Sequence, residues 1–126
     1  MFICSKISQS YVPHIDISIV MSPLKGFFLI FISYGFIFLV NEKDRLSVVT
    51  YDRQVYLDFA LRKMDKDGKD FASKKVEAIR DGSTTNLSGG LLKGLCQMID
   101  RKEKNEVASV LLFTDGLANE GNNQVQ

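Results

Sequence analysis

Val107-Ala-Ser-Val-Leu-Leu-Phe-Thr-Asp-Gly-Leu-Ala-Asn-Glu-Gly121 sets the architecture expected for the whole chain. Its first seven residues are a nearly continuous apolar run, which predicts a strand buried on both faces, as in a parallel sheet covered by helices. The run stops at Thr114-Asp-Gly116, so a carboxylate follows the carboxyl end of the strand, where open α/β sheets bind ligands. A plain Asp-Gly turn is the alternative interpretation, because that pair is common in turns.

Composition limits the functions to consider. The 126 residues suffice for one small domain, and 16 basic against 15 acidic residues give no basic excess for binding nucleic acid. Two distant cysteines, Cys4 and Cys96, do not make a disulfide framework or the spacing of a zinc finger. Cys96 is predicted to be a buried structural thiol, so a reducing compartment is allowed. A single histidine, His14, leaves no histidine-rich metal site and no histidine triad.

The first forty residues form a divergent, apolar N-terminal segment that carries the first strand and helix. Residues 1–10 lack the pattern of a secretory signal, so the localisation stays open, with an intracellular one favoured. Residues 15–20 alternate as in a strand. Residues 27–40 are almost wholly apolar but shorter than the ~20 residues of a membrane span, which favours a buried core helix or strand over membrane attachment through residues 24–40.

Two further strands are expected next, over residues 46–51 and 54–59. The first is rich in β-branched residues, and the second alternates, which places Val55, Leu57 and Phe59 on one face. Together they predict a hairpin whose second strand is an antiparallel edge strand.

Two helices are expected between this hairpin and the final strand. Residues 64–70 are predicted to be a charged loop that does not match a calcium-binding loop, and Asp70 to cap a helix that runs to about Arg80. The inward residues of this helix are Phe71, Val76 and Ile79. A second amphipathic helix ends near Arg101, and its predicted core face is Leu91, Leu92, Leu95, Met98 and Ile99. The order of elements predicts an α/β fold with a mainly parallel sheet and one antiparallel edge.

Two polar loops flank the second helix, Ser83-Thr-Thr-Asn86 at its start and Thr114-Asp-Gly116 after the following strand. A doubly wound sheet places both at one edge, where a carboxylate and hydroxyl groups are hard ligands suited to Mg²⁺. For Thr84 and Thr85, simple helix capping is the alternative. Gly90 is followed by Leu-Leu-Lys, so the loop is not a phosphate cradle of the Walker type.

Three blocks of the chain carry a family resemblance: residues 44–51, 82–91 and 111–121. In this order and spacing they resemble the von Willebrand factor type A (vWA) domain family, over residues 41–121. The resemblance implies a Rossmann-like fold and a metal-ion-dependent adhesion site for Mg²⁺ or Mn²⁺, completed by an acidic side chain of a protein partner. By motif position Thr85 and Asp115 match the family's threonine and second aspartate, with supporting residues Ser83, Thr84, Asn86 and Gly116.

The remaining part of the family's cation site is an Asp-x-Ser-x-Ser loop after the first strand, and the chain departs from it. The nearest candidate, Asp16-Ile-Ser-Ile-Val20, lies inside the predicted strand and ends in valine, so we assign no ligand role to Asp16 or Ser18. The family's later strands and helices are also absent. We therefore expect a truncated fold, with residues 41–126 forming a partial vWA domain beside the divergent segment 1–40.

Several functions remain open at this point. One is a protein-binding vWA module that uses a divalent cation through Thr85 and Asp115. The alternative is a metal-free interaction or scaffold fragment of a larger vWA protein, with or without membrane association through residues 24–40. An enzyme is not expected, because the sequence shows no convincing base and nucleophile pair. Loss of later strands is expected to leave an unpaired edge beside residues 107–113.

Overall fold

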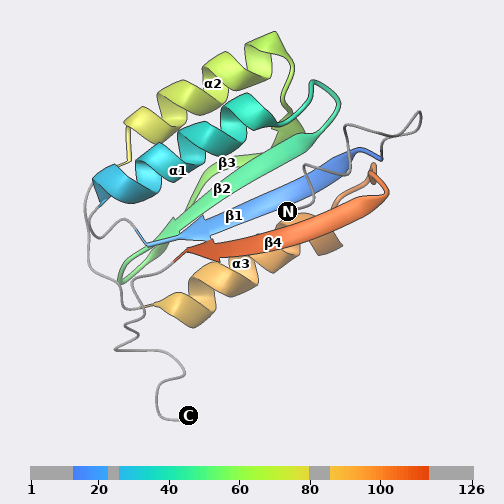
Figure 1. Cartoon of the computed structure of the whole chain (residues 1–126). Helices are drawn as coiled ribbons and strands as arrows, with labels where there is room; N and C mark the ends of the chain where they lie inside the picture. The colour runs from blue at the N-terminus through green and yellow to red at the C-terminus, as the bar shows by residue number, and fades with distance from the viewer. Residues whose placement is uncertain (1–12, 23–25, 80–85, 114–126) are drawn as a thin grey trace.

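The computed structural model describes residues 13–22, 26–79 and 86–113, with side chains from Phe31 onward in the first helix. Four strands form one sheet in the order β3-β2-β1-β4, with α1 and α2 on one face and α3 on the other (Figure 1). β1 runs parallel to β2 and β4, and β3 is antiparallel to β2, which confirms the predicted α/β fold and its antiparallel edge. The elements are β1 Ile15–Met21, α1 Gly26–Leu39, β2 Arg45–Tyr51, β3 Val55–Lys63, α2 Lys66–Glu77, α3 Leu87–Ile99 and β4 Val107–Phe113.

β1 is the central strand, and every one of its residues is buried. Because successive side chains of a strand point to opposite faces, β1 serves two separate apolar clusters. Ile15, Ile17, Ile19 and Met21 belong to the larger cluster, which includes Ile37 and Val40 at α1 and Ala72 and Val76 of α2. Val20 belongs to the smaller cluster on the α3 side, with Val49 and Tyr51.

β4 is less buried than the apolar run predicted. The strand and its parallel pairing are confirmed, but Val107 and Leu112 are 39% and 38% exposed, so burial on both faces is wrong. The reason is position, because β4 ends the sheet within the described residues and only its β1 side is paired. Among the described strands, none pairs with the other side of β4, which is the edge that was expected to be open.

β3 is an edge strand with two irregularities. Its pairing with β2 skips Asp58, since Leu57 lies opposite residue 49 and Phe59 opposite residue 48, and a second shift follows toward Lys63. An extra residue in one strand reverses which face the following side chains occupy. Phe59 accordingly packs in the larger cluster and Val55 against the smaller one, so the single face predicted for both is wrong.

α2 begins one helical turn earlier than predicted. The cap is Asp65, whose carboxylate accepts the Gly68 N–H at 2.8 Å, so the charged loop at 64–70 and the cap at Asp70 are wrong. The helix ends at Glu77 rather than near Arg80. Val76 is buried as predicted, whereas Phe71 is 37% exposed.

α3 presents a different face to the sheet from the one its leucines predicted. Its buried residues are Gly90, Gly94 and Met98, spaced four apart, whereas the exposed side chains of predicted core residues are Leu92 at 62%, Leu95 at 40% and Ile99 at 71%. A Cβ atom on Gly94 would lie 2.3 Å from Val20 Cγ2, so only glycine lets the helix approach β1 this closely. Cys96 is partly exposed rather than buried.

α1 confirms that the apolar run is a helix, but only one side of it is core. Ile37 and the following Val40 are buried, whereas Phe31, Phe38 and Leu39 are 70%, 71% and 60% exposed. Among the described residues, no helix is both long and apolar enough to cross a bilayer.

Candidate functional site at the carboxyl edge of the sheet

The carboxyl ends of the three parallel strands meet at one edge of the sheet. The Ser22 N–H, just after β1, donates to the carbonyl oxygen of Phe113 at the end of β4, at 3.2 Å. On the other side, the Asn86 N–H donates to the carbonyl oxygen of Asp52, just after β2, at 2.8 Å. The start of α3 therefore lies beside β2, as expected of a doubly wound sheet.

Most residues predicted to bind the cation lie outside the described part of the chain. These are Ser83, Thr84, Thr85, Asp115 and Gly116. Their immediate neighbours are placed, since Asn86 lies beside Asp52 and Phe113 beside Ser22, with β1 between β2 and β4. The closeness of Thr85 and Asp115 to each other stays a prediction.

Two side-chain oxygen atoms at this edge accept hydrogen bonds from backbone N–H groups. Asn86 Oδ1 accepts the Gly89 N–H at 3.1 Å, so Asn86 caps α3, the role that was the alternative for Thr84 and Thr85. Asp52 Oδ1 accepts the Gln54 N–H at 2.8 Å and so stabilises the turn between β2 and β3. These two contacts stabilise the start of α3 and the turn between β2 and β3.

The segment after β1 does not fit the cation site that the family resemblance implied. It reads Ser22-Pro-Leu-Lys-Gly26, and the first acidic residue after β1 is Glu42. Within residues 13–22, 26–79 and 86–113, no group of three or more His, Cys, Asp or Glu side chains is arranged to hold a metal ion. A hard divalent cation depends on anionic oxygen ligands, and here β1 ends at Met21 and is followed by a serine rather than by a carboxylate.

Asp16, the nearest sequence match to the missing loop, has a structural role at the opposite end of β1. Its side chain is fully buried and pairs with Arg45 Nε at 2.9 Å and Arg101 Nη1 at 2.5 Å. Asn105 donates to it from its backbone N–H at 3.0 Å and its amide at 2.8 Å. Burial acts to raise the pKa of Asp16, but the hydrogen bonds from Arg45, Asn105 and Arg101 outweigh it and hold the pKa below its ordinary value.

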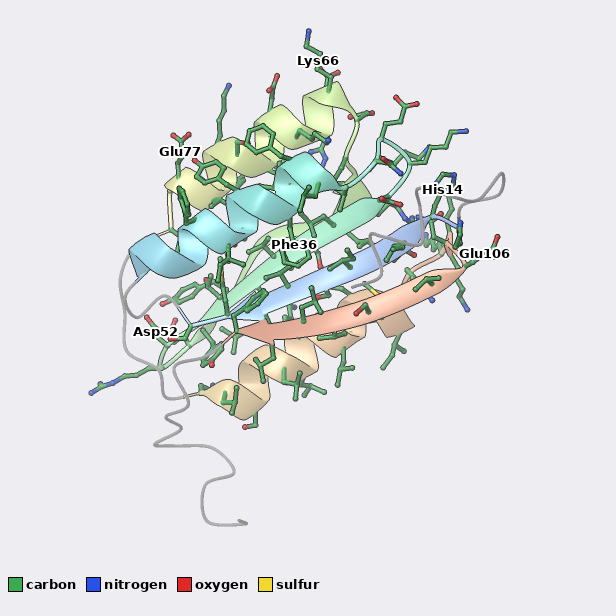
Figure 2. All side chains as sticks on the ribbon, viewed as in Figure 1. His14, Phe36, Asp52, Lys66, Glu77 and Glu106 are labelled. Atoms are coloured by element: carbon green, nitrogen blue, oxygen red, sulfur yellow. The ribbon has the colours of Figure 1, made fainter. Side chains whose placement is uncertain are left out.

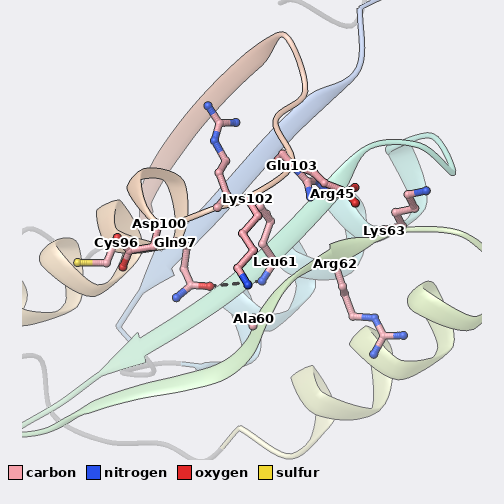
Figure 3. A pocket seen from close by; sticks show the side chains of 11 residues that line it. Arg45, Ala60, Leu61, Arg62, Lys63, Cys96, Gln97, Asp100, Lys102 and Glu103 are labelled. Atoms are coloured by element: carbon pink, nitrogen blue, oxygen red, sulfur yellow. Dashed lines mark hydrogen bonds between the residues drawn. The ribbon is translucent and has the colours of Figure 1, made fainter.

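Sequence reasoning missed a groove between the end of α3 and the end of β3, shown in Figure 3. It encloses about 460 Å³, and Gln97 Oε1 accepts the Leu61 N–H there at 3.4 Å. Five basic and two acidic side chains line it, but Arg45 and Arg101 are paired with Asp16, and the Arg62 guanidinium stacks 4.3 Å above the Phe71 ring. The groove therefore has a mixed charge that selects no ligand class.

Comparison with known proteins identifies similar sequences. The sequence model of the von Willebrand factor type A domain matches residues 20–126. The Arabidopsis thaliana E3 ubiquitin-protein ligase WAV3 is 38% identical over 78 residues, which are 61% of this chain and 10% of that protein. The probable E3 ubiquitin-protein ligase WAVH2 of the same plant is 32% identical over 83 residues, covering 62% of this chain and 12% of its own. The chain thus spans about a tenth of the length of these relatives.

Solved structures share the fold at low sequence identity. The vWF domain of the type V pili tip protein Mfa5 from Porphyromonas gingivalis superposes with a TM-score of 0.72 at 18% identity, over 86% of this chain and 40% of that one. Proximal thread matrix protein 1 from the mussel byssus, with a zinc-occupied MIDAS motif, gives a TM-score of 0.67 at 20% identity, over 85% of this chain and 30% of that one. At this identity the likeness concerns the fold alone.

Proposed function

We propose, because the chain belongs to the von Willebrand factor type A domain family, that it is a protein-binding module whose partner binding needs no divalent cation. The residues that follow β1 support the part of the proposal that partner binding needs no divalent cation. There Ser22 and the four residues after it offer no carboxylate, and Asp16 is held at the far end of the strand by two arginines.

The cation-dependent version of this function has weaker support. It would use Thr85 and Asp115 for Mg²⁺ or Mn²⁺ and an acidic side chain of the partner to complete the shell. One carboxylate and one hydroxyl group leave most of an octahedral shell to water and the partner, and such a site binds weakly. The mussel protein, whose MIDAS motif is occupied by zinc, supports this version only in that it shares the fold.

Isothermal titration calorimetry with Mg²⁺ and Mn²⁺ separates the two versions. For the full chain we expect no binding heat above dilution, and the same result for Asp115→Ala. Saturable heat that disappears in Asp115→Ala would show a working cation site and overturn the metal-free proposal.

Partner binding is tested by affinity capture with the full chain as bait, followed by quantitative mass spectrometry. One arm contains Mg²⁺, a second contains excess chelator, and a third uses Asp115→Ala. We expect the same saturable partners in all three arms. Partners lost in chelator would contradict the metal-free version, and the absence of any saturable partner in every arm would contradict the binding module itself.

The proposal includes no catalytic role. The single histidine, His14, lies beside Asp44 at the amino edge of the sheet, with Nδ1 3.8 Å from Oδ1, and the carboxylate predicted for cation binding follows the opposite edge. The two plant relatives are ubiquitin-protein ligases in which the matched segment is only about a tenth of the length, and we propose that this shared segment contributes binding rather than chemistry.

A further inference from the structure

Within the described part of the chain, β4 is hydrogen-bonded along one side only. β1 pairs with all seven of its residues, and no described strand lies on the other side, the outer side of β4, at one margin of the sheet (Figure 1). Unpaired N–H and C=O groups along an edge strand are a template for another strand. The outer side of β4 therefore suits an extended backbone rather than a helix or a small ligand.

The backbone groups on the outer side of β4 can be identified from the two ends of the strand. The Val107 N–H donates to the carbonyl oxygen of His14 at 3.4 Å, and the Phe113 carbonyl oxygen accepts the Ser22 N–H at 3.2 Å. Alternate residues of a strand direct their N–H and C=O groups to the same side. The odd-numbered residues of β4 therefore bond to β1. The residues whose N–H and C=O groups point outward are Ala108, Val110 and Leu112.

The side chains of β4 suit a neighbouring strand that is apolar on both faces. β4 has no charged residue, and its exposed residues lie near its two ends. Leu111 and Phe113 pack against the larger apolar cluster, and Val110 packs against the smaller one. Both apolar layers therefore reach this strand, so an added strand needs apolar side chains on both faces. β4 itself is such a strand.

Two copies of β4 are complementary when they run antiparallel about a two-fold axis at Val110. In that register Leu112 lies opposite Ala108 of the other copy, on the face that α3 covers, and Phe113 lies opposite Val107 on the face of α1. Each pair combines a larger with a smaller side chain, and the outward N–H and C=O groups meet as hydrogen-bonded pairs. Each pair occurs twice, so the contact is isologous.

Charge does not oppose this pairing. Glu106 stands at the start of β4, as Figure 2 shows, so the two Glu106 carboxylates of an antiparallel pair lie at opposite ends of the joined strands. The whole chain carries a formal net charge of +1, which gives little repulsion between two copies. A second copy of this chain is thus compatible with the outer side of β4 in backbone, side chains and charge.

We propose that two copies of this chain join through β4, with the strands antiparallel and Val110 at the two-fold axis, into one continuous sheet with a four-stranded half from each copy. This self-association goes beyond the proposed partner binding and does not depend on it. Because the joined strands run in opposite directions, the two carboxyl edges face opposite ends of the dimer. The dimer therefore presents two partner-binding edges that point away from each other.

Sedimentation velocity of the full chain over a concentration series measures the dissociation constant of the dimer. Leu112→Lys places a charge beside the outward backbone groups and acts twice in each dimer, so it should raise this constant about tenfold or more. The chain supplies a matched control, because Leu57 of β3 and Leu112 are both 38% exposed. Leu57→Lys should dimerise as the unchanged chain does. Circular dichroism confirms that each variant is folded.

Amide hydrogen exchange, followed by NMR at low and high concentration, locates the contact without any substitution. The N–H groups of Ala108, Val110 and Leu112 should become protected as the dimer forms. Those of Ser109 and Leu111 bond to β1 already and should change little.

Four outcomes would overturn the proposal. The first is a chain that stays monomeric at every concentration in the series, and the second is equal weakening of the dimer by Leu57→Lys. The third is a dimer in which the outward N–H groups of β4 exchange as fast as in the monomer. The fourth is a monomer in which these groups are already protected, since the chain's own residues would then cover β4.

Discussion

Asp58 should make the fold more stable as the pH falls from neutral toward 5. It is the extra residue in the irregular pairing of β3, and its Oδ2 atom is buried without a hydrogen-bond partner in the described contacts. Loss of hydration raises the pKa of Asp58 to about 6, although hydrogen bonds from Thr50 and the charge of Lys75 act in the opposite direction.

The sign and size of the effect follow from proton linkage. The ordinary pKa of the carboxyl is 3.8, so between 3.8 and about 6 the folded chain binds a proton that the unfolded chain does not. The free energy of unfolding therefore rises as the pH falls through 6. For these two pKa values, the gain from about pH 7.5 to about pH 5 is on the order of 1 kcal/mol. The lowered pKa of Asp16 acts below 4 and leaves this window unaffected.

Urea denaturation at both pH values measures the effect. Asp58→Asn should raise the free energy of unfolding near pH 7.5 by about 1–2 kcal/mol, since the full ionisation penalty of about 3 kcal/mol is reduced by solvent screening and by the polar amide. The variant should also lose the rise toward pH 5. Asp70→Asn, at an exposed position of α2, is the control and should keep it. An Asp58→Asn variant with the unchanged chain's pH dependence would refute the reasoning.

Three further variants test the packing and the buried ion pairs by the same denaturation measurement. Gly94→Ala should lose about 1–3 kcal/mol, because its methyl group would meet Val20 at 2.3 Å; unchanged stability would contradict the close approach of α3. Gly35→Ala should gain about 0.5–1 kcal/mol, because nothing lies within 4 Å and alanine favours helix; a loss would mean that this site is packed. Asp16→Ala should cost about 3–5 kcal/mol, because Arg45 and Arg101 would stay largely buried without their carboxylate partner. A loss below about 1 kcal/mol would contradict the stabilising role of Asp16.

Local patterns predicted the strands well, because alternation and β-branched residues report directly on the backbone. They failed where the burial of a side chain depends on tertiary packing. The leucines of α3 have helical spacing, yet the glycines at 90 and 94 pack closer to the sheet, and glycine carries no hydrophobic signal. The apolar run of β4 predicted full burial, yet burial also requires a neighbouring strand on each side.

For the candidate site, the described residues allow only the neighbours of the two loops to be compared with the prediction. The alternation of strands and helices put both loops at the carboxyl edge, and the contact of Asn86 with Asp52 agrees with that. The role of the Asn86 side chain was not predictable, because serine, threonine and asparagine are all good caps and only the backbone decides which one serves.

The two borders of the sheet differ in a way that limits how molecules can join. The pairing of β3 is interrupted twice, and the strand carries Asp58, Arg62 and Lys63. Irregular pairing and charged side chains on an edge strand disfavour pairing with a strand of another molecule. β4 is regular along all seven residues and has no charge. Among the described strands, β4 is therefore the border better suited to the addition of a further strand, and β3 is the border that resists it.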